Sequence, residues 1–133
     1  MSDVEMKTLI DMAIEAREKA YPKLSQYKVG AAIRDTYGNY WTGYNVETDI
    51  HHAIHAEMSA IHQMIGAEPR ARIVRIAVAC ADRAWFPCGW CRQWIWEYAM
   101  SQVTIVMAHC IKTGETKEMS IGELLPDGFR LTQ

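Results

Sequence analysis

Four side chains of this sequence could together bind and use a metal ion: the imidazole of His55, the carboxylate of Glu57 and the thiols of Cys88 and Cys91. A structural zinc site is normally closed by four protein ligands, whereas a catalytic site has three and keeps one position for water. We therefore expect one Zn²⁺ ion per chain, bound by His55, Cys88 and Cys91. Glu57 is then a spare carboxylate beside the open position.

The spacing of these residues suits a shared metal site. Cys88 and Cys91 are three residues apart, so a single helical turn can bring both sulfurs to one ion. Cys88 and Cys91 lie at the predicted start of a helix, where the partial positive charge of the helix end favours the thiolate form that binds metals. His55 also stands at the predicted start of a helix. Two such helix starts meeting at one ion would also stabilise negative charge that develops during a reaction.

These groups suit the hydrolytic deamination of an aminopyrimidine or aminopurine. The reaction needs a nucleophile stronger than neutral water, a proton for the ring nitrogen beside the attacked carbon, and a proton for the departing amine. Zinc can lower the pKa of a bound water molecule to about 7, and a nearby carboxylate can take the proton of that water and pass it on. Glu57 follows His55 by two residues, so we expect it to reach over the metal without coordinating it.

The composition is that of an ordinary globular domain and excludes several classes of protein. With 133 residues, 50% of them hydrophobic, the chain fits one catalytic domain over residues 1–133 that needs no disulfides to support its core. The net charge of −2 is unlike that of a nucleic-acid-binding protein. The sequence has no apolar run long enough for a membrane span and no secretion signal, so we expect no membrane partner and a cytoplasmic location. In a reducing compartment the cysteines favour metal-binding or core roles.

The first half of the sequence predicts a helix, a hairpin and a second helix. Apolar residues recur at helical spacing up to about Ala20. Residues 29–33 and 40–46 are expected to form the two strands of the hairpin. Residues 55–65 give one apolar helical face, and Gly66 stands where a C-terminal cap is expected.

The second half predicts an alternation of strands and helices. Residues 73–79 and 103–107 are apolar runs typical of strands buried on both faces, and residues 89–100 between them can form a third helix. A weaker strand at 116–119 and a short helix at 121–125 follow. This order predicts an α/β domain in which helices cover a sheet.

Several segments give the sequence a more specific resemblance. The combination of H-x-E with P-C-x-x-C is the signature of zinc nucleobase deaminases, and over nearly its whole length the chain resembles the short form of the cytidine deaminase family. The segments that carry the resemblance are VGAA at 29–32, GYNVE at 43–47, HAE at 55–57, PCGWCRQ at 87–93 and ELLP at 123–126. The resemblance implies a three-layer α-β-α fold with a mixed central sheet of about five strands.

The resemblance also implies a reaction and partners. The reaction is the hydrolytic deamination of cytidine or deoxycytidine, or of a close analogue, to the uridine form and ammonia. A zinc-activated hydroxide would attack C4 of the base, and Glu57 would protonate N3 and then the leaving amine. Short family members form homotetramers with shared active sites and usually act in pyrimidine salvage. The expected partners are therefore a small pyrimidine nucleoside and further copies of this chain.

Further substrate-binding residues follow from matching positions in the family. Asn45 and Glu47 match the residues that hold the ribose hydroxyls. Tyr27 takes the place of the aromatic residue that packs by the base, and the backbone of Ala56 is expected to contact the pyrimidine edge. Phe129 is expected to match a terminal Phe that lines the pocket of a neighbouring subunit.

The sequence departs from the family pattern near the metal ligands. Short members usually have Cys where this chain has His55, and Arg where it has Met58. Three thiolates on Zn²⁺ leave a net negative charge that the Arg can offset, whereas one His and two thiolates leave none, so we expect the two changes to compensate each other. The loop 48–54 is shorter and lacks a Tyr that reaches the sugar in an adjacent subunit. His51 or His52 is the expected replacement, and an altered substrate preference would arise there.

Other interpretations of the metal-binding residues remain open. Cys88 and Cys91 could be a redox dithiol, although this leaves His55 and Glu57 unexplained. A closed structural zinc site needs a fourth ligand. The candidates for that ligand are Cys80, His109 and Cys110, and the rival histidines are His51, His52 and His62.

Other functions also remain open. One is a deaminase of another cytosine compound, such as blasticidin S or an N4-modified cytidine, although Glu47 favours a substrate with a true ribose. Another is a zinc-stabilised interaction module without catalytic activity. Trp90, Trp94 and Trp96 could stack on bases, but such residues more often lie in a core or a subunit interface.

Overall fold

The computed structural model describes residues 2–131, and no helix in this part of the chain is long and apolar enough to cross a membrane. The first helix is followed by two strands, a short two-stranded ribbon and the second helix. A strand, the third helix, two further strands and a short helix complete the described chain. The elements are α1 (Asp3–Arg17), β1 (Gly30–Asp35), β2 (Tyr40–Tyr44), β3 (Val46–Glu47), β4 (Ala53–Ile54), α2 (Ala56–Ala67), β5 (Ile73–Cys80), α3 (Gly89–Tyr98), β6 (Ile105–Cys110), β7 (Thr116–Ser120) and α4 (Ile121–Leu124).

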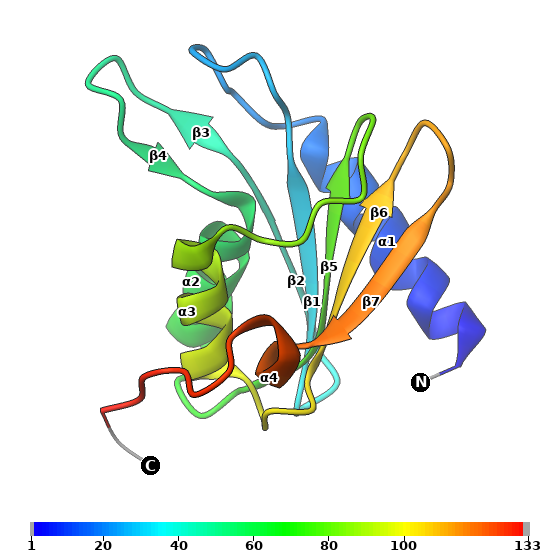
Figure 1. Cartoon of the computed structure of the whole chain (residues 1–133), viewed down its shortest axis with the longest axis vertical. Helices are drawn as coiled ribbons and strands as arrows, with labels where there is room; N and C mark the ends of the chain where they lie inside the picture. The colour runs from blue at the N-terminus through cyan, green and yellow to red at the C-terminus, as the bar shows by residue number, and fades with distance from the viewer. Residues whose placement is uncertain (1, 132–133) are drawn as a thin grey trace.

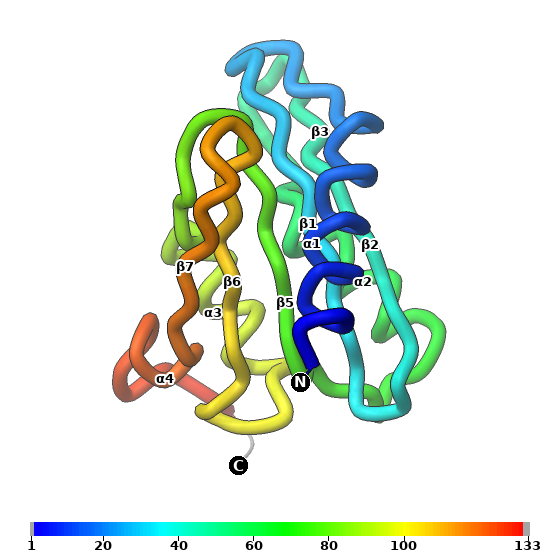
Figure 2. Tube along the Cα trace, turned by 90° about the vertical axis from the view of Figure 1, so that its right-hand side faces the viewer, coloured from blue at the N-terminus to red at the C-terminus, as the bar shows by residue number. Residues whose placement is uncertain are grey.

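Five strands form the central sheet in the order β2-β1-β5-β6-β7. β5 and β6 are parallel, and the other neighbouring pairs are antiparallel. A parallel pair needs a crossover connection, and α3 lies within the one between β5 and β6. α1 covers one face of the sheet, and α2 and α3 cover the other (Figure 1, Figure 2). The expected three-layer α-β-α fold with a mixed sheet is confirmed.

Two hydrophobic cores lie on the two faces of the sheet because successive strand side chains point to opposite sides. One core packs under α1, and the other packs under α2 and α3. In each of three strands, two adjacent residues belong to different cores: Ala32 and Ile33, Ile76 and Ala77, and Val106 and Met107. The apolar run at 73–79 is thus part of a central strand covered on both faces, as predicted.

Gly43 of β2 allows the second helix to approach the sheet closely. A Cβ atom at Gly43 would lie 2.3 Å from the carbonyl oxygen of Ala56 and 2.5 Å from the amide nitrogen of Ala60. Both separations are too short for a side chain, so the first turn of α2 can rest on β2 only where β2 has a glycine. Because His55 immediately precedes this turn, the close approach also fixes where His55 lies.

The end of the first helix differs from the prediction. α1 ends at Arg17 rather than near Ala20. Beyond it the chain pairs with a distant segment: Tyr21 forms an isolated bridge with Val46, and the Tyr21 amide donates to the carbonyl of Asn45 at 2.9 Å. This pairing draws the chain out of the helix earlier than its local pattern indicates.

The ends of α2 and β2 also differ from the prediction. Gly66 is not a C-terminal cap, because α2 continues to Ala67. The predicted strand 40–46 is divided: β2 ends at Tyr44, and β3 pairs with β4 in a separate ribbon. Figure 1 shows this ribbon beyond the end of the main sheet, above α2 and α3 in that view.

Candidate metal centre and active site

The starts of α2 and α3 bring the three predicted metal ligands together. His55 immediately precedes α2, Cys88 immediately precedes α3, and Cys91 lies in the first turn of α3. The two helices lie side by side on the same face of the sheet (Figure 1). His55 Nδ1 is 3.2 Å from Cys91 Sγ and 3.5 Å from Cys88 Sγ, and the three ligand atoms all lie within 4.8 Å of one another.

These separations fit a zinc ion. With Zn–N bonds of about 2.0 Å and Zn–S bonds of about 2.3 Å, neighbouring ligand atoms of a tetrahedral site lie about 3.5–3.8 Å apart. Among residues 2–131 no other group of three or more His, Cys, Asp or Glu side chains could hold a metal ion. The residues considered as rival or fourth ligands lie outside the group: Cys80, Cys110, His51, His52, His62 and His109. Three ligands without a fourth favour a catalytic site over a closed structural one.

Glu57 lies in the first turn of α2 with only 5% of its surface exposed. Burial raises the pKa of its carboxyl group, while hydrogen bonding to the backbone, the nearby His55 and a hydrogen bond with Cys91 oppose the rise. A buried carboxyl group of this kind holds a proton more readily than an exposed one. Glu57 thus lies next to the ligand group without belonging to it.

Two local effects act on the thiols of the metal centre. Burial raises the pKa of the Cys91 thiol, and the negative charge of Glu57 raises it further. A bound cation reverses this balance because it favours the thiolate. The backbone amide of Cys91 points at Cys88 Sγ, with a separation of 3.5 Å, so the start of α3 stabilises negative charge on that sulfur.

A cavity of about 480 Å³ lies against the metal centre. His55, Ala56, Glu57 and Cys88 form the part of its wall that comes from the two helix starts. Three residues predicted from the family pattern also line it: Tyr27, Asn45 and Glu47. The volume lies in the range of pockets that bind small molecules.

The side chain of Asn45, which follows β2, forms hydrogen bonds with the segment before β1. Its side-chain Oδ1 accepts a hydrogen bond from the Val29 amide at 2.8 Å, and its Nδ2 donates to the Tyr27 carbonyl at 2.9 Å. Asn45 is buried, and it is one of the residues that line the cavity. The amide plane is therefore fixed by the protein before any ligand binds.

Glu47 is held by the segment 23–26. Its Oε1 accepts hydrogen bonds from the amides of Leu24 at 2.9 Å and Ser25 at 2.8 Å, and its Oε2 accepts one from the Ser25 hydroxyl at 2.6 Å. These hydrogen bonds, those from Ser25 above all, lower the pKa of Glu47. The cavity thus contains a fixed carboxylate that is ionised at neutral pH.

Tyr27 joins the segment before β1 to the loop after β5. Its hydroxyl donates to Asp82 Oδ1 at 3.0 Å, and its ring centroid lies 6.2 Å from that of Trp85. Burial, the neighbouring Cys80 and the hydrogen bond with Asp82 raise the pKa of Tyr27. The ring forms part of the cavity wall as a neutral aromatic surface.

Comparisons with known proteins agree with this geometry. The family model described as "Cytidine and deoxycytidylate deaminase zinc-binding region" matches residues 4–107. A cytidine deaminase from Halalkalibacterium halodurans is 34% identical over 128 residues, which cover 95% of each chain. The chain belongs to the cytidine deaminase family. A crystal structure of cytidine deaminase from Burkholderia pseudomallei has a TM-score of 0.87 at 34% identity and covers 97% of this chain and 100% of that chain. A cytidine deaminase from Mycobacterium tuberculosis is 31% identical over 134 residues, or 98% of this chain and 94% of that protein.

Zinc is the metal of this family, and His55, Cys88 and Cys91 are positioned to bind it. The compensation expected between His55 and Met58 stays a prediction. Met58 is only 4% exposed and lies beside Glu57 in α2. An uncharged side chain suits such a buried position.

Phe129 does not line the cavity of its own chain. Its side chain is 66% exposed, and its carbonyl accepts a hydrogen bond from Gln93 Nε2 at 2.8 Å. Ala56, in contrast, is completely buried and forms part of the cavity wall. The contact of Phe129 with a neighbouring subunit stays a prediction.

The loop between β3 and β4 contains the two histidines expected to replace the missing Tyr. His51 has a left-handed backbone with φ of 64°, and both His51 and His52 are exposed. A second cavity, of about 360 Å³, lies between this loop, His55 and Trp90. Of the other tryptophans considered, Trp94 and Trp96 pack against the core, as expected for such residues.

Sequence reasoning missed the loop after β5 as part of the cavity wall. Asp82, Arg83 and Trp85 all line the cavity, and the Arg83 guanidinium lies 5.3 Å from the centre of the Trp85 ring. The available signal was topological: β5 runs parallel to β6, and ligands of α/β sheets often bind beyond the carboxyl ends of such strands.

Proposed function

We propose that this chain catalyses the hydrolytic deamination of cytidine or 2′-deoxycytidine, or of a close analogue, to the uridine form and ammonia. The observation that carries the proposal is the placement of a buried, uncoordinated carboxyl group, Glu57, beside a three-ligand zinc site on the wall of a nucleoside-sized cavity. Membership of the cytidine deaminase family supports the same reaction.

Glu57 moves the protons of this reaction. When bound, the zinc ion supplies the Lewis-acid activation that makes water reactive at neutral pH. Glu57 accepts the proton of that water, gives it to N3 of the base, and transfers a second proton to the amine that leaves from C4. Water supplies the oxygen and both protons, so cytidine and water give uridine and ammonia. Burial of Glu57 favours its protonated form, which helps it to act as a donor.

Asn45 and Glu47 bind one sugar hydroxyl between them. Each carboxylate oxygen has two acceptor positions. Both positions of Glu47 Oε1 are occupied by backbone amides, and one position of Oε2 is occupied by Ser25, so one acceptor position remains. Asn45 retains one N–H on Nδ2. A ribose hydroxyl can donate to Glu47 and accept from Asn45 at the same time.

Tyr27 and Ala56 bind the base. The Tyr27 ring lies in the cavity wall and supplies a flat apolar surface. Ala56 lies between the ligand His55 and the proton carrier Glu57, so its backbone is the part of the chain best placed to meet the pyrimidine edge. Burial of Ala56 keeps this contact free of water.

The active unit is a homotetramer of single-domain chains in which neighbouring subunits complete each cavity. Phe129 and the loop of His51 and His52 supply the intersubunit contacts, and their exposure in the single chain supports this arrangement. The physiological role is pyrimidine salvage in the cytoplasm. Sedimentation of the purified protein measures the assembly directly.

An ultraviolet assay with four substrates tests the proposed reaction. The substrates are cytidine, 2′-deoxycytidine, blasticidin S and adenosine, each with and without a zinc chelator. We expect loss of cytosine absorbance with the two cytosine nucleosides, abolished by the chelator and restored by added zinc. Activity on blasticidin S alone, or on none of the four, would contradict the proposal.

A further inference from the structure

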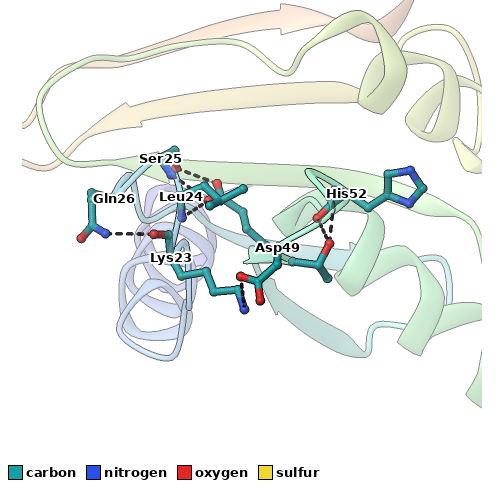
Figure 3. A network of polar contacts seen from close by, with 8 residues as sticks. Lys23, Leu24, Ser25, Gln26, Asp49 and His52 are labelled. Carbon is teal, nitrogen blue, oxygen red and sulfur yellow. Dashed lines mark hydrogen bonds and ion pairs between the residues drawn. The ribbon is translucent and has the colours of Figure 1, made fainter.

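The carboxylate of Glu57 lies at the metal centre, whereas the carboxylate of Glu47 lies in the cavity wall and is held there by a neighbouring segment of the chain. Three hydrogen bonds from Leu24 and Ser25 reach Glu47, at 2.6–2.9 Å. The same segment is fastened at its start by an ion pair of 2.8 Å between Lys23 and Asp49 (Figure 3). Asp49 follows Glu47 by two residues, so the segment is attached to the β3–β4 region at two separate points.

Backbone conformation supports the fixed shape of this segment. Gln26 has a left-handed backbone with φ of 62°, which makes the chain turn sharply after Ser25. The side-chain amide of Gln26 donates to the Lys23 carbonyl at 3.1 Å and closes the turn (Figure 3). The turn directs the amides of Leu24 and Ser25 at the same carboxylate oxygen.

Ser25 has a distinct role within the segment because its hydroxyl uses both its donor and an acceptor position. It donates to Glu47 Oε2 at 2.6 Å and accepts from the Tyr27 amide at 3.1 Å. The second contact fixes the hydroxyl, and the first fixes the rotation of the carboxylate. Ser25 also lines the cavity itself. It therefore connects the residue proposed to bind the sugar with the residue proposed to pack by the base.

We propose that Ser25 is a positioning residue for the sugar end of the cavity. It holds the Glu47 carboxylate in one rotation, so that the one remaining acceptor position of Oε2 faces a nucleoside hydroxyl. Without the Ser25 hydroxyl, the backbone amides still hold Oε1, but Oε2 can bind water instead of the sugar. The inference rests on the proposed function, because it concerns how that substrate is held.

The effect of Ser25 is specific to binding of the sugar hydroxyl. Loss of one hydrogen bond to a charged group weakens an interaction by a factor of roughly three to ten or more. Ser25→Ala is therefore expected to raise KM for cytidine roughly fivefold while kcat changes little. For 2′,3′-dideoxycytidine, which lacks the hydroxyls on C2′ and C3′, kcat/KM is expected to stay unchanged. Ser25→Thr keeps the hydroxyl and is expected to restore the KM for cytidine.

A double-mutant cycle tests whether Ser25 acts through Glu47. In a Glu47→Ala background, Ser25→Ala is expected to have no further effect on KM for cytidine. Ser101→Ala is the matched control, since it also removes a serine hydroxyl but lies before β6 and outside the cavity wall, and its KM is expected to equal that of the wild type. Circular dichroism of each variant verifies folding.

The outcomes separate this inference from the proposed function. If the wild-type protein deaminates no cytosine nucleoside, the proposed function itself is wrong. If the wild type is active but Ser25→Ala leaves KM unchanged, the positioning role is wrong. The role is also wrong if Ser25→Ala impairs cytidine and 2′,3′-dideoxycytidine equally, or if its effect persists in full without Glu47.

Discussion

The rings of His55 and Trp90 lie edge to face, with centroids 5.7 Å apart and planes inclined at 64°. His55 Nδ1 faces the two ligand sulfurs, and within residues 2–131 no hydrogen-bond partner is found for its other ring nitrogen. A histidine that binds a metal is usually oriented by a hydrogen bond from that second nitrogen. In this chain the contact with Trp90, which is itself 58% exposed, orients the ring instead.

Trp90→Ala is therefore expected to weaken zinc binding by roughly tenfold, the lower end of the effect of losing an orienting partner. Competition with a chromogenic chelator measures this affinity without reference to turnover. Trp90→Phe keeps an aromatic edge and should retain most of the affinity. Equal zinc affinity in the wild type and Trp90→Ala would show that the contact does not orient His55.

Removal of the Glu57 carboxylate separates catalysis from metal binding. Glu57→Ala is expected to keep one zinc ion per chain and to lose activity by roughly 10²–10⁴-fold, the usual contribution of a general acid or base. Atomic absorption gives the zinc content, and the ultraviolet assay gives kcat. Glu15→Ala, which removes an exposed carboxylate on α1, is the control. A fully active Glu57→Ala protein would contradict the proposed mechanism.

The pairing of His55 with Met58 can be tested by restoring the usual family residues. His55→Cys adds a third thiolate and should lower kcat/KM, because the site then has an uncompensated negative charge. Met58→Arg alone places a charge at a buried position and should lower stability by roughly 3 kcal/mol or more. The double substitution is expected to be more active than the product of the two single effects predicts. Strictly additive effects would mean that the two positions do not compensate each other.

Replacement of glycine with alanine is expected to have opposite effects on the free energy of unfolding at Gly43 and at Gly66. Gly43→Ala forces a Cβ atom against the backbone of α2 and should lower the free energy of unfolding by roughly 2–3 kcal/mol. Gly66→Ala adds a methyl group where no atom lies within 4 Å, inside a helix, and should raise it by about 0.5–1 kcal/mol. Urea unfolding measures both. A neutral Gly43→Ala would mean that α2 can move away from β2.

The elements of this fold were largely predictable because their signals are local. The predicted strand at 73–79 and the predicted helix at 55–65 correspond to β5 and α2, and each of their boundaries differs by no more than about two residues. The early end of α1 was not predictable, because it depends on the bridge between Tyr21 and Val46, two positions far apart in sequence. The split of β2 and β3 has the same cause, since β3 pairs with β4 rather than with β1.

The residues of the candidate site were also predictable only in part. The ligand group was predictable from residue types, since His and Cys at these spacings have few other uses. The hydrogen bonds that hold Glu47 were not predictable, because those from Leu24 and Ser25 to Oε1 come from backbone amides and do not depend on the type of side chain. Asp82 and Trp85 were missed because only the folded sheet brings the loop after β5 next to Tyr27.

The position of His55 and Cys88 before two different helices has a consequence for the unfolded chain. The two residues are 33 positions apart, and the whole of α2 and β5 lies between them. A shared ion would act as a cross-link that closes this stretch into a loop. A covalent link of that span removes chain entropy equivalent to roughly 4 kcal/mol. Loading with metal should therefore protect α2 and β5 from proteolysis more than α1, which lies outside the loop.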